Sequence, residues 1–399
     1  MTMIRRTIQP VLERLAGQYP VVTLTGPRQS GKTTLVRAAF PNHDYVSLED
    51  PDQREFAGTD PRGFLGQFAG NVVLDEAQRV PDLFSYIQTS VDRDDSGGRY
   101  ILSGSQNFLL MRTVSQSLAG RAAILHLLPF SLCELQARSS VAPAQIGIRV
   151  PKPAAFGGRL AEVLFRGFYP RIHDKGLPPR RWLSDYYRTY VERDVRELLS
   201  VGDLEAFGRF IRLCGGRNGQ LLNLSGLAND CGVTHTTARR WLSVLEASFL
   251  VLLLRPHHRN FNKRLVRSPK LYFLDTGLLC YLLGIRSPEA LEAHASRGAV
   301  FESFVVSELS KHYAHRGEEP RLFFWRDHTG HEVDLLIDRG DAIVPVEIKS
   351  GQTMADDFLD GIRYYRQLGA DQSSPAALVY GGDRSFRRSG VVVYSWADL

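Results

Sequence analysis

Short apolar runs alternate with helix-like stretches between about residues 20 and 130. Five of these runs are rich in β-branched and aliphatic residues: VVTLTG, YVSLED, NVVLDE, YILSGS and AILHLLPFS. Strands that alternate with helices form parallel sheets covered by helices, so this pattern predicts an α/β fold. We place this first domain at residues 1–136.

The pattern changes after residue 136. Residues 137–160 are rich in Ala, Pro, Ser and Gly, which is typical of a flexible connection. From about residue 161 to 212 apolar and aromatic positions recur with helical spacing, as in LSDYYRTYVERDVRELL. We therefore expect a flexible linker and helical region over residues 137–212.

Residues 213–288 read as a winged helix-turn-helix. LSGLAND and THTTARRWLSVLE have helical patterns, and the turn CGV between them contains Gly232, which tolerates a positive φ. A predicted hairpin with a basic tip follows as the wing. We expect eight apolar residues to form the shared core: Leu224, Leu227, Ala228, Val233, Ala238, Trp241, Leu242 and Leu245. Winged helices also serve as protein-contact modules and as parts of AAA+ ATPases, so DNA contact is one of several roles.

Residues 289–399 combine an amphipathic helix, GAVFESFVVSELSKH, with strand-like runs in FFWRDHTGHEVDLLIDRGDAIVPVEIKSG. Alternation along VEIK puts Glu347 and Lys349 on one face of a strand, and Asp334 can lie beside Glu347 across the turn. We expect Asp334, Glu347 and Glu302 to bind Mg²⁺ through oxygen. Lys349 would position a water or stabilise charge on a phosphate. The alternative is that these charged residues form surface salt bridges.

The segment VVTLTGPRQSGKTTLV, residues 21–36, fits the phosphate-binding pattern G-x-x-x-x-G-K-[ST] from Gly26 to Thr33. It follows a β-branched run and opens an apolar helix, so backbone N–H groups and the helix N-terminus can hold phosphates. We expect Lys32 to reach the β- and γ-phosphates and Thr33 to ligate Mg²⁺. The nucleotide-binding residues predicted here are Gly26, Pro27, Arg28, Gln29, Ser30, Gly31, Lys32, Thr33 and Thr34. An ordinary glycine-rich turn is the alternative.

Two acids close the apolar strand NVVLDEAQ. We expect Asp75 to hold Mg²⁺ and Glu76 to polarise the attacking water, which argues for hydrolysis of ATP rather than for binding alone. Taken alone, the two acids could equally cap the next helix. Ser103, Ser105 or Asn107, at the end of the run RYILSGSQN, could sense the γ-phosphate or could form a turn.

Arg121 precedes the last predicted strand of the first domain. An arginine in this position could act as a catalytic arginine finger, given in trans by a neighbouring subunit of a homo-oligomer. Exposed arginines are usually solvated, so the alternative is a surface side chain.

Composition narrows the class of protein. The chain has 399 residues, of which 43% are hydrophobic and 23% charged, which is ordinary for a globular protein. Its four cysteines are scattered and lack zinc-ligand spacing, so we expect reduced thiols. The longest apolar run, residues 249–254, is far too short to span a bilayer, and we see no signal peptide. We expect a cytoplasmic protein that does not contact a membrane.

Positive charge concentrates in the predicted winged helix. Residues 209–270 contain eleven lysines and arginines against two acids, whereas the whole chain has a net charge of +6. Such concentration favours a phosphate backbone as partner, so we predict DNA contact by Arg239, Arg240, Lys263 and Arg264. Nothing in the sequence supports readout of a particular base sequence.

Two resemblances follow from these motifs. The order of a helical Glu, the run EVD and the run EIK resembles the PD-(D/E)XK nuclease superfamily. The whole chain resembles a prokaryotic family of AAA-type ATPases with a C-terminal domain of unknown function. This second resemblance is carried by LTGPRQSGKTTL, VVLDEAQRVPDLF, SLAGR, LPFSLCEL, YYRTYVERDV, YFLDTGLLCYLLG, FESFVVSEL and VEIKSG. It implies ATP and Mg²⁺ as ligands and a nuclease-like C-terminal fold.

These observations support two main hypotheses. In the first, the protein is an ATPase whose nucleotide state controls a DNA-engaging winged-helix and nuclease-like module. In the second, it is an ATP-dependent regulatory switch on a protein partner, such as a toxin or defence component, and the nuclease-like domain is inactive. A transcription factor with a degenerate ATPase is a third reading, but the intact Lys32, Asp75 and Glu76 argue against it.

Overall fold

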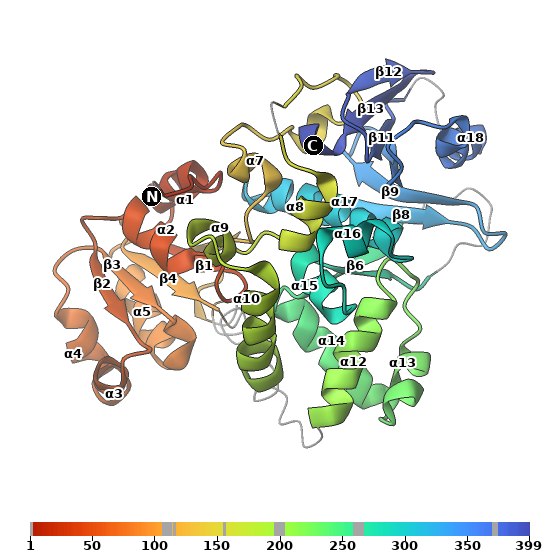
Figure 1. Cartoon of the computed structure of the whole chain (residues 1–399). Coiled ribbons are helices and arrows are strands. Elements are labelled where there is room, and N and C mark those ends of the chain that lie inside the picture. Colours follow the sequence, from red (N-terminus) through yellow and green to blue (C-terminus); the bar gives the residue numbers. More distant parts are fainter. Residues whose placement is uncertain are drawn as a thin grey trace. The chain divides into compact units, whose positions relative to one another are not determined.

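The computed structural model describes residues 3–105, 114, 117–154, 157–194, 204–257, 267–368 and 374–399 (Figure 1). These residues form two compact units. The N-terminal unit consists of Met1–Phe130 together with two short later segments, Ala247–Phe249 and Ala314–Glu318. The C-terminal unit contains the remaining residues, Ser131–Glu246, Leu250–Tyr313 and Glu319–Leu399.

The N-terminal unit is built on a five-stranded sheet with the order β2-β3-β4-β1-β5, in which all neighbouring strands are parallel. Its elements are α1 (Gln9–Ala16), β1 (Val21–Thr25), α2 (Lys32–Ala39), β2 (Asp44–Ser47), α3 (Pro51–Thr59), α4 (Pro61–Gly66), β3 (Val72–Asp75), η1 (Ala77–Arg79), α5 (Leu83–Val91), β4 (Tyr100–Gly104) and β5 (Ala122–His126). The parallel sheet predicted from the alternating pattern is confirmed.

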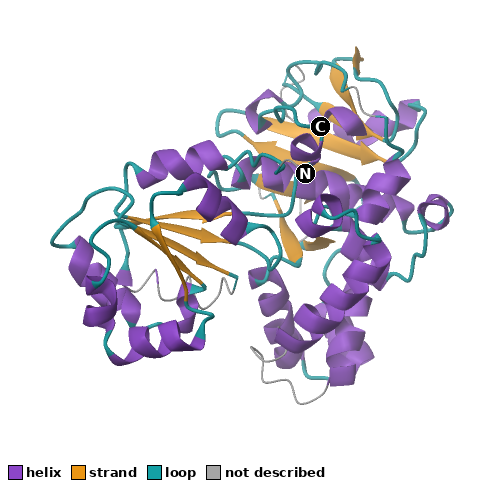
Figure 2. Ribbon diagram, turned by 60° about the vertical axis from the view of Figure 1, so that its left-hand side comes forward, coloured by secondary structure: helices purple, strands orange, loops and turns teal. Residues whose placement is uncertain are grey.

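Helices cover both faces of this sheet (Figure 2). Side chains alternate between the two faces, so Val21 packs in one core cluster with residues of α4 and α5. Val22 and Leu24 pack in another with residues of α1 and α2. Parallel strands share one direction, so the carboxyl ends of β1, β3 and β4 meet at one edge of the sheet.

The C-terminal unit contains an eight-stranded mixed sheet with the order β12-β13-β11-β10-β9-β8-β6-β7. Its strands are β6 (Val251–Pro256), β7 (Lys270–Phe273), β8 (Leu322–Arg326), β9 (Glu332–Asp338), β10 (Ile343–Lys349), β11 (Ala377–Tyr380), β12 (Phe386–Arg388) and β13 (Val391–Ser395). Strand β6 pairs with β7 and also with β8, so the strands of the predicted wing continue the sheet of residues 289–399.

Helices of the C-terminal unit supply the rest of its core. They are α7 (Leu132–Leu135), η2 (Pro143–Gln145), α8 (Leu160–Arg166), α9 (Pro170–Asp174), α10 (Pro179–Tyr186), η3 (Tyr187–Asp194), α12 (Leu204–Gly216), α13 (Leu224–Cys231), α14 (His235–Ala247), α15 (Thr276–Leu282), α16 (Pro288–Glu292), α17 (Arg297–Ala314), η4 (Asp356–Leu359), α18 (Asp360–Gln367) and η5 (Trp396–Asp398). Within the described ranges, no helix is both long and apolar enough to cross a bilayer.

Helices α13 and α14 are joined through Gly232, whose φ of 70° lies in the left-handed region that glycine adopts without strain. Asn223 caps α13, since its side chain accepts a hydrogen bond from the backbone N–H of Gly226. Six of the eight predicted core residues are buried: Leu227, Ala228, Ala238, Trp241, Leu242 and Leu245. The other two, Leu224 and Val233, are partly buried against them.

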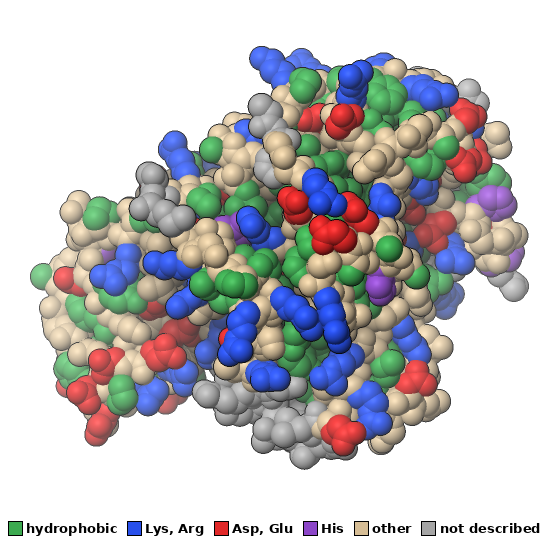
Figure 3. All heavy atoms as spheres, in the orientation of Figure 1, with side chains coloured by type: hydrophobic (Ala, Val, Ile, Leu, Met, Phe, Trp, Pro, Cys, Tyr) green, Lys and Arg blue, Asp and Glu red, His purple; other side chains and the backbone are tan. Residues whose placement is uncertain are grey.

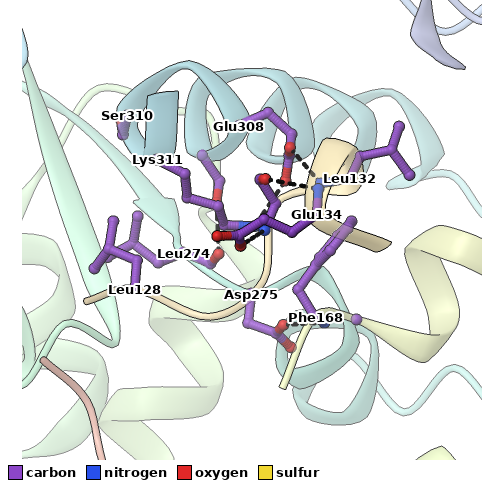
Figure 4. Close-up of polar contacts among 12 residues, drawn as sticks. Leu128, Leu132, Glu134, Phe168, Leu274, Asp275, Glu308, Ser310 and Lys311 are labelled. Atoms are coloured by element: carbon purple, nitrogen blue, oxygen red, sulfur yellow. Dashed lines mark hydrogen bonds and ion pairs between the residues drawn. The ribbon is translucent and has the colours of Figure 1, made fainter. Parts of the chain in front are cut away.

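Helix α17 carries an ion pair into the core of the C-terminal unit (Figure 4). Lys311 Nζ lies 2.7 Å from Glu308 Oε1, and both side chains are fully buried. The other carboxylate oxygen of Glu308 accepts a hydrogen bond of 2.8 Å from the backbone N–H of Leu132 at the start of α7. The Lys311 ammonium also lies 3.9 Å from the ring centroid of Phe168. Burial raises the pKa of the Glu308 carboxyl, and Lys311 opposes that shift.

Candidate functional site

The predicted phosphate loop connects β1 to α2 at the carboxyl edge of the parallel sheet. Gly31 caps α2 with a φ of 93°, in the left-handed region. Gly26 has a φ of 152° and packs so closely on the chain after β5 that a Cβ atom there would lie 2.1 Å from the carbonyl oxygen of Leu127. The two glycines of the sequence pattern are therefore required by the backbone path of the loop.

The side chain of Lys32 is buried inside the loop. Its Nζ donates hydrogen bonds of 2.9 Å to the carbonyl oxygens of Gly26 and Pro27. Burial lowers the pKa of Lys32 to about 8, while Glu76 and Asp75 oppose this shift. Carbonyl oxygens of the loop thus hold the Lys32 ammonium group near Asp75 and Glu76, the two acids at the end of β3.

Asp75 is the centre of a hydrogen-bonded cluster. Thr33 Oγ1 donates to its Oδ2 at 2.7 Å, and the Tyr45 hydroxyl donates to the same oxygen at 2.8 Å. Ser103, which lies opposite Asp75 in the β3–β4 register, donates to Oδ1. Burial and the nearby Asp75 carboxylate raise the pKa of Tyr45. Sequence reasoning did not identify Tyr45, because a tyrosine in a strand carries no signal for such a contact.

Glu76 follows Asp75 in a left-handed conformation, with a φ of 53°. Non-glycine residues rarely adopt this conformation outside constrained sites. Two side chains hold its Oε2 atom: Gln78 donates through Nε2, and Ser105 donates through Oγ at 3.1 Å. Ser103 and Ser105 therefore contact the two acids, whereas Asn107 lies outside the described residues. Gln78 was not predicted as a site residue.

The other predicted site residues vary in exposure. Ser30 is buried, Arg28 is half-buried, and Gln29 and Thr34 are exposed. Arg121 lies in the turn before β5, where it forms an ion pair with Asp92 and donates to the Ala119 carbonyl at 3.3 Å. Its role as an arginine finger for another subunit stays a prediction.

These residues fit a nucleotide with Mg²⁺. Thr33 and Asp75 place a hydroxyl and a carboxylate oxygen 2.7 Å apart at the end of the loop, and both are hard ligands of the kind that Mg²⁺ prefers. Among the described residues no group of three or more His, Cys, Asp or Glu side chains could hold a metal ion without further ligands. Mg²⁺ in phosphate-transfer sites takes the rest of its ligands from water and phosphates, so one carboxylate and one hydroxyl are sufficient.

The predicted metal cluster of the C-terminal unit is brought together around lysines. Lys349 Nζ lies 2.7 Å from Glu347 Oε2 and 3.3 Å from Asp334 Oδ2. Asp334 also accepts a hydrogen bond of 2.8 Å from the backbone N–H of Ile348. Burial and the neighbouring Asp334 carboxylate raise the pKa of Glu347 to about 9, and Lys349 opposes this shift.

Glu302 is held by groups that sequence reasoning missed. Lys270 Nζ lies 3.1 Å from Glu302 Oε1, and the Tyr272 hydroxyl donates to the same oxygen at 2.5 Å. Lys270 also forms an ion pair with Glu332. Lys270 and Lys349 thus contact the carboxylates of this set, and the metal role of Glu302, Asp334 and Glu347 stays a prediction.

Two sets of arginines are exposed on the C-terminal unit. Arg239 and Arg240 are exposed on α14, while Lys263 and Arg264 lie outside the described residues. Lys and Arg side chains also gather over α10 and α12 (Figure 3). The exposed arginines of this basic face are Arg180, Arg181, Arg188, Arg209 and Arg212. None of these five was among the predicted DNA contacts.

Comparison with known families divides the chain into three matched regions. The family described as "AAA domain" matches residues 18–136. Two families described as domains of unknown function, DUF8612 and DUF4143, match residues 157–289 and 297–399.

Among solved structures, the chain is similar to the Walker-type ATPase paby2304 of Pyrococcus abyssi, with 15% identity and a TM-score of 0.44 over 70% of this chain and 96% of that one. It is also similar to AMPPCP-bound DnaA from Aquifex aeolicus, with 14% identity and a TM-score of 0.25 over 60% of this chain and 85% of that one.

Two curated mycobacterial proteins are similar along their length. They are "Uncharacterized protein Rv2008c" of Mycobacterium tuberculosis and "Uncharacterized protein Mb2031c" of Mycobacterium bovis. Each is 33% identical over 402 aligned residues, covering 100% of this chain and 85% of the relative. The chain therefore belongs to the family of these mycobacterial proteins, and its residues 18–136 match the AAA domain family.

Proposed function

We propose that the N-terminal unit binds ATP with Mg²⁺ and hydrolyses it, and that the nucleotide state controls the C-terminal unit. One observation carries the proposal: the Thr33 hydroxyl and the Asp75 carboxylate lie 2.7 Å apart, beside a loop that encloses the Lys32 ammonium. A glycine-rich turn without a ligand has no need to bury a lysine between two carbonyls.

The residues of the chain have separate roles in this proposal. The backbone N–H groups of the loop and the N-terminus of α2 bind the phosphates. Lys32 leaves the carbonyls of Gly26 and Pro27 and binds the β- and γ-phosphates. Thr33 and Asp75 would hold Mg²⁺, which supplies neutralisation of charge on the phosphate oxygens.

Glu76 is the proposed residue that acts on water. Its carboxylate would orient a water molecule toward the γ-phosphate and accept the water's proton. Gln78 and Ser105 both donate to one of its oxygens, Oε2, which fixes the carboxylate and leaves the other oxygen for the water. Glu76 directly precedes η1, but its side chain makes no capping hydrogen bond, which favours the proposed role over that of a helix cap.

The test is ATP hydrolysis by the purified protein with Mg²⁺. We expect Glu76→Gln to lower kcat by about 100-fold or more while nucleotide binding is retained, since this is the usual contribution of a general base. Lys32→Ala should abolish binding. Glu55→Gln, a change at an exposed acid on α3, is the matched control. Hydrolysis by Glu76→Gln at the parent's rate would refute the assignment.

We further propose that the C-terminal unit binds DNA by contacting the phosphates of the DNA backbone. The exposed Arg239 and Arg240 on α14, in a region with eleven basic residues against two acids, support this proposal. Each lost phosphate contact reduces the slope of log affinity against log salt concentration by about 0.9. The double variant Arg239→Ala/Arg240→Ala should therefore lower the slope by about 2. The same double change at Arg180 and Arg181 tests whether the basic face contributes.

One observation favours the second hypothesis, a regulatory switch on a protein partner. Lys270, which was not predicted at this site, forms ion pairs with Glu302 and Glu332 and so competes with a metal ion for the Glu302 carboxylate. End-labelled duplex and branched DNA, incubated with the protein and Mg²⁺, would decide between the two. Intact strands and an ATPase rate indifferent to DNA would support the switch. Cleavage that is lost in Asp334→Ala would establish a nuclease.

A further inference from the structure

Two short segments from the second half of the chain are built into the N-terminal unit, at strand β5 of its sheet. The ring centroids of Phe249 and of His126, on β5, lie 5.4 Å apart. Gly317 packs so closely that a Cβ atom there would lie 3.0 Å from a methyl of Leu125, on β5, and 3.1 Å from one of Val11, on α1. The segment Ala314–Glu318 is thus a packed part of this unit.

Arg6 joins that segment to the phosphate loop. Its side chain is buried, and it donates hydrogen bonds of 2.8 Å to the Ser30 carbonyl and 2.6 Å to the Leu128 carbonyl. The guanidinium lies 4.8 Å from the ring centroid of Phe130. On the other side, His315 Nε2 lies 3.5 Å from Arg6 Nη2, and the imidazole is buried as well. Since arginine can only donate, His315 faces it with an acceptor nitrogen.

The hydrogen bond from Arg6 to the Ser30 carbonyl sets the orientation of the next backbone N–H, that of Gly31, which belongs to the proposed phosphate-binding loop. In a trans peptide the C=O and the following N–H point in opposite directions. Because the Ser30 carbonyl points at Arg6, the N–H of Gly31 points away from Arg6. Gly31, with a φ of 93° and no Cβ, would leave this peptide free to rotate. Arg6 removes that freedom.

We propose that Arg6 is a positioning residue for the nucleotide loop, and that His315 couples the loop to helix α17. The proposal rests on the ATP binding proposed above. Arg6 holds the Ser30 peptide in place, so when Lys32 leaves the loop carbonyls for phosphates, the rearranged loop strains the contacts of Arg6, including the one with His315. His315 follows α17 directly in the chain, and α17 carries Glu302, Glu308 and Lys311 in the C-terminal unit. The chain thus passes from the residue beside Arg6 straight into the helix that carries these charged groups.

The role of Arg6 is tested by nucleotide affinity. Arg6→Lys keeps the positive charge but loses the paired donors that hold Ser30 and Leu128 together. We expect binding of a fluorescent ATP analogue to weaken about tenfold or more, because the hydrogen bonds lost are charge-assisted. Arg5→Ala, at the exposed neighbouring arginine, should bind as the parent does. A folded Arg6→Lys protein with the parent's affinity would overturn the positioning role, and its circular dichroism spectrum shows whether it is folded.

The role of His315 is tested by hydrogen exchange with a non-hydrolysable ATP analogue and Mg²⁺. In the parent we expect the analogue to slow exchange both in the loop and in the last turns of α17. In His315→Ala the loop should still respond, whereas the response of α17 should be lost. Glu318→Gln, at an exposed residue of the same segment, should behave as the parent does.

The outcomes separate this inference from the proposed function. A parent whose loop does not respond to the analogue, and which does not bind it, would contradict ATP binding itself. A parent whose loop responds while α17 never does would leave ATP binding intact and overturn the coupling. An unchanged α17 response in His315→Ala would also overturn it.

Discussion

Replacing Lys311 by methionine removes the cation from the buried ion pair of α17 and keeps an unbranched side chain of similar length. The parent pair has an Nζ–Oε1 distance of 2.7 Å and no solvent exposure on either side. In the variant Glu308 retains the backbone N–H of Leu132 as a donor but loses its counter-charge. The ammonium contact with Phe168 is lost as well.

Removing one partner of a buried pair costs about 3–5 kcal/mol, because the remaining charge is neither solvated nor paired. Complete burial of both side chains puts this pair in that class. The double variant Glu308→Gln/Lys311→Met removes both charges of the pair and keeps an acceptor for the Leu132 N–H. We expect it to be clearly more stable than Lys311→Met alone.

The loss of stability in Lys311→Met should depend on pH. Burial raises the pKa of Glu308, and without Lys311 the pKa rises further. The folded variant then holds a proton that the unfolded chain releases above its ordinary carboxyl pKa. Stability is therefore highest below that ordinary value and falls as the pH rises through the folded pKa. The variant should be closer to the parent at pH 5 than at pH 8.

Urea unfolding, followed by tryptophan fluorescence, measures the loss of stability of the C-terminal unit, which contains Lys311. All four tryptophans, Trp182, Trp241, Trp325 and Trp396, belong to the C-terminal unit. Lys175→Met, at an exposed lysine, is the matched control. A Lys311→Met protein with the parent's urea midpoint at pH 8, or an equal loss at pH 5 and pH 8, would refute the reasoning.

Three further predictions concern the nucleotide loop and the cluster of lysines and acids in the C-terminal unit. Gly26→Ala should abolish nucleotide binding in a calorimetric titration, because its Cβ would lie 2.1 Å from the Leu127 carbonyl oxygen; binding at the parent's affinity would contradict the close approach. Because burial lowers the pKa of Lys32 to about 8, binding of phosphates should raise this pKa and take up protons at pH 8.5 but not at pH 6.5. Equal binding heats at pH 8.5 in buffers of different ionisation enthalpy would count against that uptake. Lys270→Met removes the cation shared by Glu302 and Glu332, so Mn²⁺ should raise the melting temperature of the variant but not of the parent. No response in either protein would argue that the lysine is not what excludes the metal.

The phosphate loop and the two acids that close β3 could be identified from the sequence. Each is a short pattern whose chemistry depends on residues close together in the chain, such as Gly26, Gly31, Lys32 and Thr33. The alternating strands and helices also predicted a parallel sheet, in which β1, β3 and β4 end at the same edge because parallel strands run in one direction. Thr33 and Asp75 were both expected to hold Mg²⁺, and the sheet brings their oxygens within 2.7 Å of each other.

Only the tertiary structure decided which groups surround these residues. Arg6 and His315 are 309 positions apart, and nothing local to either residue indicates the other. Lys270 was counted among the basic residues of a DNA-binding wing, yet it lies buried between Glu302 and Glu332 because β7 belongs to the eight-stranded sheet. Pairing and burial set the charge and pKa of such groups, and both depend on long-range packing, which a local pattern of residues does not encode.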